Sequence, residues 1–336
     1  MEHDEPSLAL VWDTFTGYQR TAALKAGIEL DLFTHIAAGA VTIDALAERC
    51  HAAARGLRAL LNHLVVDGFL RRDGDRYALR ATAAAFLDRN SPTYLGSAVT
   101  FIAAPMIVDG FTRLTDAVCR GGTAIPERGV LAPEHPVWVQ FARAMAPLAG
   151  MTAQLLGNLL DIEQVKECKL LDVAAGHGMF GITLARLNSG VHVTAVDWQN
   201  VLAVAQQHAR DAGIEERFRT ITGSAFDVPF GEGYDLVLMP NFLHHFNPTM
   251  CEQLLAKARA ALAPGGRVVI VEFVPDDDRL GPPDAVRFGL VMLAGTPGGD
   301  AYTFSEYQTM LGHAGFHRVT LRELQPSPAR VVIAER

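Results

Sequence analysis

The chain has 336 residues, of which 49% are hydrophobic and 20% are charged, and its formal net charge is -8. This length predicts two domains with enough residues for a sizeable core. The composition is typical of a mildly acidic globular protein. It argues against nucleic acid as a partner, because binding phosphates requires a surplus of cationic side chains.

Cysteine spacing and the N-terminal sequence indicate the compartment. The four cysteines are Cys50, Cys119, Cys168 and Cys251, and none forms a C-x-x-C pair. Neither a zinc cluster nor a disulfide framework is indicated, which fits a reducing cytoplasm. The start MEHDEPSLAL is acidic and lacks the features of a secretion signal. The longest uncharged run, residues 91–108, contains two prolines, so we expect a buried helix there and not a membrane span.

Residues 1–100 are predicted to form a mainly helical domain. Apolar residues recur at helical spacing from Leu8 to about Ile28. Two shorter helices follow, in TIDALAERC, which starts on a threonine cap, and in ARGLRALLNHLVVDG, which Gly68 closes. FLRRDGDRYAL then predicts two short strands around a turn at residues 73–75. This order of elements predicts a winged helix.

A winged helix most often binds DNA, but the charge of this one argues against it. Residues 1–100 contain ten Lys and Arg against twelve Asp and Glu, whereas a DNA-binding module carries a cationic surplus. The second helix of the pair has Arg55 and Arg58 but is otherwise apolar. Residues 8–67 offer more apolar helical surface than so short a segment can bury alone, so we predict a homodimer formed through this domain.

Residues 101–160 are predicted to be a helical connector that contributes to a substrate pocket. Proline and glycine punctuate its first part, and the apolar segment VWVQFARAMAPLAGMTAQLLGNLL follows. We assign Phe141 and Met145 of this segment, and Met292 further along the chain, to the pocket wall. Packing in the core is the alternative for each of them.

From residue 169 onward, strand and helix patterns alternate. The strands are KLLDVA, VHVTAVD, FRTITG, YDLVLMP and RVVIVEFV, and the helices between them include MFGITLARLN, NVLAVAQQHARDAG and PTMCEQLLAKARAAL. This alternation predicts an α/β domain with a doubly wound, mostly parallel sheet over residues 161–336. HRVTLREL and ARVVIAER add two possible strands. Ligands of such sheets bind beyond the carboxyl ends of the strands, so the candidate site residues follow each strand.

The segment LLDVAAGHGMFGITLARL contains G-x-G-x-x-G at Gly176, Gly178 and Gly181. In dinucleotide enzymes these glycines face a pyrophosphate. Here Asp172 precedes them, and its carboxylate would repel a pyrophosphate and attract a cationic amino acid. Asp197 ends the next strand, placed to accept both ribose hydroxyls. The two acids favour S-adenosylmethionine, which is cationic and has no phosphate, over NAD; Gly181 then lies within a helix and allows close packing.

Further residues are candidates for the adenosine part of this cofactor. Trp198 follows the ribose acid and can stack on adenine, with an ordinary core or surface tryptophan as the alternative. The segment GSAF, Gly223 to Phe226, follows the third strand, where the adenine edge would lie. Ser224 offers a hydrogen bond there, and Phe226 offers a packing surface.

These motifs together resemble the small-molecule O-methyltransferases that include the plant caffeic-acid type and many bacterial natural-product enzymes. The residues that carry the resemblance are LLDVAAGHG, AVDWQNV, GSAFDVP, NFLHHF, ALAPGGRVVIVEFV and GGDAYTFSEYQTMLGHAGF. It covers nearly the whole chain. It implies a winged-helix dimerisation domain, a class I Rossmann-like methyltransferase domain, and S-adenosylmethionine as the cofactor with S-adenosylhomocysteine as its product.

Methyl transfer to a hydroxyl requires a base that takes the acceptor's proton. NFLHHF places His244 and His245 directly after the fourth strand, and a neutral imidazole suits a phenol or an enol. By the resemblance, His244 matches the family's catalytic histidine and Glu272 matches an acid that orients it. His245 stands where many members carry Asp, and we assign it to the substrate.

The chain departs from the family's pattern at three positions. The second orienting acid maps to Ala301, so Asp300 or Tyr302 would have to replace it, and both are assigned to the substrate side. Pro240 occupies the position of the family's lysine. Asn241 replaces a frequent tryptophan, and we assign it to the cofactor.

We therefore predict a cytoplasmic S-adenosylmethionine-dependent O-methyltransferase that acts on a small aromatic or polyketide-like metabolite without a metal. Methylation of carbon or nitrogen, or a pericyclic or hydroxylation reaction, stays open because of Ala301. A ligand-sensing regulator and an NAD oxidoreductase are weaker alternatives. The acids of PDDDR, residues 275–279, suggest a metal site, but such a run beside proline is more typical of a solvated loop.

Overall fold

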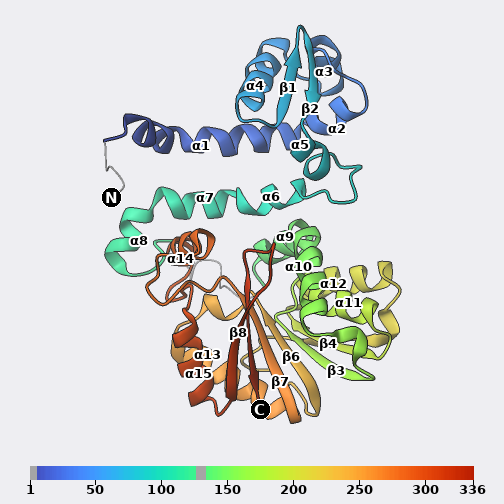
Figure 1. The fold of residues 1–336 in the computed structure, drawn as a ribbon, viewed down its shortest axis with the longest axis vertical. Helices are drawn as coiled ribbons and strands as arrows, with labels where there is room; N and C mark the ends of the chain where they lie inside the picture. Colours follow the sequence, from blue (N-terminus) through green and yellow to red (C-terminus); the bar gives the residue numbers. More distant parts are fainter. Residues whose placement is uncertain (1–5, 126–133) are drawn as a thin grey trace. The chain divides into compact units, whose positions relative to one another are not determined.

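The structure is a computed structural model that describes residues 6–125 and 134–336 (Figure 1). The chain divides into two compact units, Met1–Ala103 and Ala104–Arg336. The predicted connector belongs to the second unit from residue 104 onward, and its residues 126–133 lie outside the described part of the chain.

The first unit is helical with one small hairpin. Its elements are α1 (Leu8–Glu29), α2 (Leu32–Ala37), α3 (Ile43–Arg49), α4 (Ala54–Val66), β1 (Leu70–Asp73), β2 (Arg76–Leu79), α5 (Ala81–Phe86), the 3-10 turn η1 (Gly96–Ala98) and α6 (Val99–Ile102). The Thr42 hydroxyl caps α3 by accepting the N–H of Ala45 at 3.4 Å. Gly68 follows α4 with φ of 83°. The predicted order of helix, helix and hairpin is confirmed.

Helix α1 exposes most of its apolar side chains in the chain as described. The core of this unit is built from α2, α3, α4 and the hairpin, with Phe33, Leu61 and Tyr77 each at 1% exposure or less. In contrast, the exposed fraction at the start of α1 runs from 47% for Val11 to 82% for Leu8. This unit therefore presents an apolar helical surface.

Residues 91–108 do not form the single buried helix that the sequence predicts. They begin as a loop, pass through η1 and α6, and break at Ala103 and Ala104 before α7 (Pro105–Thr112) starts. The break has a physical cause, because Pro105 has no N–H with which to continue a preceding helix. Ile102 and Val108 are about half exposed, at 54% and 49%. None of the helices in residues 6–125 and 134–336 has the length and apolarity that crossing a membrane requires.

The second unit contains a seven-stranded sheet. Helices α7, α8 (Leu114–Arg120), α9 (Pro136–Ala144) and α10 (Ala146–Leu159) come first, and the strands are β3 (Cys168–Val173), β4 (Val191–Asp197), β5 (Phe218–Thr222), β6 (Tyr234–Pro240), β7 (Leu262–Glu272), β8 (His317–Glu323) and β9 (Arg330–Glu335). Their order is β5-β4-β3-β6-β7-β9-β8. Strand β9 runs antiparallel to both β7 and β8, and the other six strands of this sheet share one direction, which confirms the predicted mostly parallel sheet.

Helices cover both faces of this sheet (Figure 1). They are α11 (Met179–Leu187), α12 (Gln199–Asp211), α13 (Pro248–Ala261) and α15 (Phe304–His313), whereas α14 (Pro283–Gly295) packs against α7 and α8. Successive side chains of a strand point to opposite faces of the sheet, so they belong to two different cores. Leu170 and Leu238 pack with α10, α11 and α12, and Leu171 and Met239 pack with α13 and α15.

The strand order determines where a ligand can bind. The chain adds β4 and β5 on one side of β3, and β6 and β7 on the other side. The carboxyl ends of these five parallel strands share one edge of the sheet, and the order reverses between β3 and β6. Open α/β sheets bind their ligands at such a switch point.

Candidate active site

The loop after β3 is tied to the end of β4. Gly176 and Gly178 have φ of 57° and 72°, which glycine adopts without strain. A Cβ atom on Gly178 would lie 3.0 Å from the Cβ atom of Ala205. The carboxylate of Asp197 accepts the N–H of Gly176 at 2.8 Å and the N–H of Trp198 at 2.7 Å. Asp197 thus holds the glycine loop in place.

Asp172 is completely buried beside this loop. Its Oδ2 atom accepts the N–H of Gly181 at 3.2 Å, and its Oδ1 atom has no partner among the described residues. A Cβ atom on Gly181 would lie 2.7 Å from Val193 Cγ1, so the predicted close packing of this helix on the sheet is confirmed. Burial raises the pKa of Asp172 to about 7 and that of Asp197 to about 6. A group that donates to these carboxylates, above all a cation, would offset that cost.

The residues predicted for adenosine lie at the ends of β4 and β5. Trp198 precedes α12 and packs with Ala142 and Val201. Gly223 has φ of 136°, and its N–H donates to the Asp197 carbonyl at 2.9 Å. The Ser224 hydroxyl accepts the N–H of Phe226 at 3.2 Å, so it also holds its own turn.

Lys257 supports the same turn from α13. Its Nζ atom donates to the carbonyls of Ala225 at 2.6 Å and Phe226 at 2.9 Å, and it lies 4.4 Å from the centre of the Phe230 ring. Burial lowers its pKa. Sequence reasoning missed Lys257, because a lysine on an amphipathic helix carries no local signal that distinguishes it from a solvated one.

His244 and Glu272 form a buried pair. His244 lies in the short turn η5 (Leu243–His245) after β6, and Glu272 ends β7. His244 Nδ1 and Glu272 Oε2 are 2.5 Å apart, and the side chains are 5% and 1% exposed. Glu272 Oε1 also accepts the N–H of Phe242 at 2.9 Å. Because a carboxylate accepts, Nδ1 carries a hydrogen toward Glu272, and the neutral form of such an imidazole has its lone pair on Nε2.

Aromatic rings surround this pair. The His245 ring lies 4.2 Å from the His244 ring, edge to face, and 5.2 Å from Trp138. Burial, and then the proximity of His244, lowers the pKa of His245 well below its ordinary value, and its Nδ1 atom is buried with no partner among the described residues. Phe288 of α14, which sequence reasoning missed, contacts His244 at 4.7 Å between ring centres.

The remaining candidates for the substrate pocket are spread over α9, α10 and α14. Phe141 stacks on His177 at 5.6 Å between ring centres, and its Cε1 atom would lie 3.3 Å from a Cβ atom on Gly176. It therefore covers the glycine loop. Met145 lies half-buried at the junction of α9 and α10, and Met292 is buried in α14, the helix that carries Phe288. Asn241 directly follows β6 with φ of 50°, and its N–H donates to the Val271 carbonyl at 2.8 Å.

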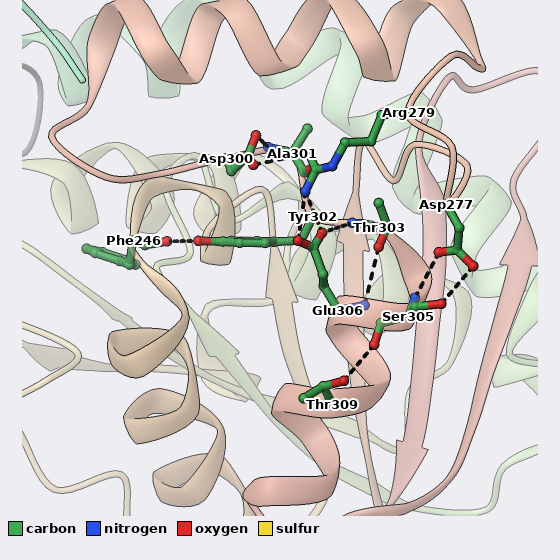
Figure 2. A network of polar contacts seen from close by, with 10 residues as sticks. All are labelled: Phe246, Asp277, Arg279, Asp300, Ala301, Tyr302, Thr303, Ser305, Glu306 and Thr309. Carbon is green, nitrogen blue, oxygen red and sulfur yellow. Dashed lines mark hydrogen bonds and ion pairs between the residues drawn. The ribbon is translucent and has the colours of Figure 1, made fainter. Parts of the chain in front are cut away.

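Asp300 and Tyr302, the two residues left open as replacements for the second acid, are each bound to a group other than His244 (Figure 2). Asp300 pairs with Arg279 at 3.1 Å. The Tyr302 hydroxyl donates to the Phe246 carbonyl at 2.5 Å, and burial raises the pKa of this phenol, which keeps it protonated. Both side chains therefore have other partners.

The three acids of PDDDR also bind separate partners. Asp276 pairs with Arg330 at 2.7 Å, Asp277 accepts from the Ser305 hydroxyl at 2.7 Å, and Asp278 accepts the N–H of Leu280 at 2.9 Å. In the part of the chain that the structure describes, no three His, Cys, Asp or Glu side chains gather as metal ligands.

A sheet of this order, with acids at the ends of β3 and β4 and a His–Glu pair beyond β6 and β7, defines a class I methyltransferase. Residues 125–317 match the O-methyltransferase domain family, and residues 12–89 match the O-methyltransferase dimerisation domain. The chain therefore belongs to the O-methyltransferase family. The predicted enzyme class, and S-adenosylmethionine as the cofactor, are confirmed at the level of this family.

Particular relatives share nearly the full length of the chain. It is 32% identical over 330 residues to the 3-hydroxy-5-methyl-1-naphthoate 3-O-methyltransferase of Streptomyces sahachiroi, which covers 96% of this chain and 94% of that protein. It is 29% identical over 300 residues to the tetracenomycin polyketide synthesis 8-O-methyl transferase TcmO of Streptomyces glaucescens, with 88% and 87% covered. A solved structure of a candidate O-methyltransferase from Nostoc punctiforme PCC 73102 has a TM-score of 0.94 and 48% identity, with 99% and 100% covered.

Proposed function

We propose that this protein transfers a methyl group from S-adenosylmethionine to a hydroxyl of a small aromatic, polyketide-like molecule, with His244 as the general base. The observation that carries the proposal is the buried 2.5 Å contact between His244 and Glu272, which fixes the imidazole and leaves Nε2 for the acceptor. The names of two relatives support the substrate class, because one acts on a hydroxynaphthoate and the other in tetracenomycin polyketide synthesis.

The residues at the ends of β3, β4 and β5 fit this cofactor. The unpartnered Oδ1 atom of buried Asp172 suits the ammonium group, and Asp197 suits the ribose hydroxyls. Gly176 has no Cβ atom to stand between its backbone and a ligand, and it adopts its positive φ without strain. Ser224, with its neighbours Gly223 and Phe226, would hold the adenine, and Trp198 and Asn241 would flank the cofactor. When bound, S-adenosylmethionine supplies a methyl group already activated by its sulfonium.

The protein's own part in the reaction is proton transfer and alignment. His244 Nε2 takes the proton of the acceptor hydroxyl, and the imidazolium that forms is stabilised by the Glu272 carboxylate on Nδ1. The neutral His245 adds no positive charge beside this imidazolium. Its unpartnered Nδ1 atom offers the acceptor a hydrogen bond, so we assign His245 to substrate orientation.

Methylation of carbon is the second candidate, and two observations favour it. The second orienting acid is replaced by Ala301, and the L-tyrosine C(3)-methyltransferase of Streptomyces lavendulae is 30% identical over 207 residues, which is 60% of this chain. The test is to incubate the protein with S-adenosylmethionine and 3-hydroxy-5-methyl-1-naphthoate, followed by a panel of phenols and polyketide aromatics, and to locate the added methyl by NMR. A methyl on oxygen supports the proposal, and a methyl on carbon supports the second candidate.

The first unit forms a homodimer in this proposal. The match of residues 12–89 to the dimerisation domain and the exposed apolar side chains of α1 support it. Light scattering is expected to show twice the chain mass. Phe15, which is 69% exposed, is the residue to change: Phe15→Asp should weaken the dimer, whereas Thr14→Asp on the same helix is the control for added charge. A monomeric parent protein would contradict the proposal.

A further inference from the structure

The turn that carries His244 is held from several sides. Glu272 holds it from β7 through the N–H of Phe242. From α13, the thiol of Cys251 lies 3.2 Å from the Leu243 carbonyl and 3.6 Å from the Phe246 carbonyl. From the segment before α15, the Tyr302 hydroxyl donates to the same Phe246 carbonyl at 2.5 Å. The thiol is a weak donor, so Tyr302 makes the main hydrogen bond to that carbonyl.

The segment before α15 lies directly against this turn. A Cβ atom on Gly299 would lie 2.1 Å from the His244 carbonyl oxygen and 2.8 Å from the carbonyl carbon of His245. Only glycine permits so close an approach of two backbones. The Thr296 hydroxyl accepts the N–H of Gly299 at 2.9 Å, which holds the segment in its bend.

A network around Arg279 holds the other end of this segment (Figure 2). Arg279 donates to the Ala301 carbonyl at 3.2 Å and makes two bonds of 2.7 Å to the carboxylate of Glu306. Glu306 in turn closes a capping box with Thr303 at the start of α15. Tyr302 lies inside this frame and is only 3% exposed. Its hydroxyl is therefore presented to the His244 turn by a rigid support.

We propose that Tyr302 is a positioning residue for His244, and that it compensates through the backbone for the orienting acid that Ala301 replaces. The inference rests on the proposed role of His244. Glu272 contacts the His244 ring only at Nδ1. If the turn that carries His244 shifts, the rest of the ring therefore shifts with it. Anchoring the carbonyl two residues beyond His244 restrains that motion. Without this hydroxyl, the Phe246 carbonyl keeps only the weak thiol donor of Cys251, at 3.6 Å.

The test compares two tyrosines of the same core. Tyr302→Phe removes the hydroxyl that holds the turn. Tyr307→Phe is the matched control, because Tyr307 is fully buried, its ring centre is 6.0 Å from that of Tyr302, and its hydroxyl has no partner among the described residues. The readout is the downfield proton NMR signal of the His244 Nδ1–H in histidine-labelled full-length protein saturated with S-adenosylhomocysteine. We expect Tyr302→Phe to shift or remove this signal and Tyr307→Phe to leave it in place.

A second variant keeps the test decisive if Tyr302→Phe does not fold. Arg279 is 42% exposed, and Arg279→Gln should move the same signal less and in the same direction. If the His244 signal does not move in Tyr302→Phe, the inference is overturned, even if the melting temperature falls. If only Arg279→Gln folds, an unmoved signal in that variant overturns it in the same way. The signal does not depend on turnover, so an active His244→Ala would refute the proposed base without deciding the role of Tyr302.

Discussion

The two ends of the active site are built in different ways. At the cofactor end, beyond β3, β4 and β5, Asp172 accepts the N–H of Gly181, nine residues further on, and Asp197 accepts the N–H of Gly176, 21 residues earlier. At the acceptor end, beyond β6 and β7, the contacts join distant segments. Glu272 is 28 residues from His244, and Tyr302 is 56 residues from Phe246. Both ends therefore depend on contacts between separate elements, and the side chains that face the ligand are tied to more distant segments at the acceptor end.

The variant His244→Ala should have the largest effect and should separate the two ends most clearly. Methyl transfer is expected to fall by a factor of roughly 10² to 10⁴, the usual contribution of a positioned base. The affinity for S-adenosylhomocysteine, measured by calorimetry, should stay the same because the imidazole lies at the acceptor end. Glu272→Gln should cost less, since it keeps the shape and loses the charge. An active His244→Ala beside an inactive His245→Ala would assign the base to His245.

The variant Asp197→Ala should lower cofactor affinity more than the rate of methyl transfer, which is the opposite of His244→Ala. It removes a carboxylate that suits the ribose hydroxyls and that also holds the N–H of Gly176, so cofactor affinity should fall by roughly 10- to 100-fold, the range for losing hydrogen bonds to a charged group. The rate at saturating cofactor should change much less. Calorimetry and initial rates measure the two quantities. A fall in rate without a fall in affinity would show that the two ends are not independent.

The buried acids predict that cofactor binding releases protons. Burial raises the pKa of Asp172 to about 7 and of Asp197 to about 6, and a bound ammonium and bound hydroxyls favour the ionised forms. Near pH 6.5 the binding enthalpy of S-adenosylhomocysteine should therefore change with the ionisation enthalpy of the buffer. Asp172→Asn should lose most of this dependence. Proton uptake on binding would contradict the assignment.

The same shifts determine how stability depends on pH without a ligand. Because both pKa values are raised, the folded protein binds more protons than the unfolded chain between about pH 4 and pH 7. The contribution of these two acids to the free energy of unfolding should therefore be fully present below this window and be lost as the pH rises through it. Denaturant unfolding at a series of pH values measures this. Asp172→Asn should make the free energy of unfolding less dependent on pH in this window. An unchanged slope would show that other groups cause the dependence.

The smallest expected effect concerns Lys257, which supports the cofactor end from a distant helix. Lys257→Met should weaken the binding of S-adenosylhomocysteine by roughly three- to tenfold, about the net contribution of one ordinary hydrogen bond, because Lys257 acts only through the turn it supports. Lys169→Met is the matched control. Lys169 also donates to a backbone carbonyl, that of Glu232, and lies over the Tyr234 ring, but it belongs to the opposite end of the sheet. Equal effects of the two variants would refute a specific role for Lys257.

Sequence patterns were sufficient for the architecture. The segment VHVTAVD is β4 with identical bounds, and the predicted wing is the hairpin β1–β2. These signals are local. The alternation of apolar and polar residues in a strand, the threonine that caps a helix and the glycine that ends one each involve only a few neighbouring residues. The resemblance to a family added the pairing of His244 with Glu272, which no local pattern shows and which the geometry bears out as a contact.

What the sequence by itself determined is therefore the order of elements, the sheet, and which side chains follow each strand. Only the tertiary structure decided the partners of those side chains. Residues 91–108 form separate short helices on either side of Ala103 and Ala104, and the Tyr302 hydroxyl donates to the Phe246 carbonyl. The physical reason is range: backbone periodicity is a property of adjacent residues, whereas a buried hydrogen bond depends on which distant donor the packed chain brings within about 3 Å of an acceptor.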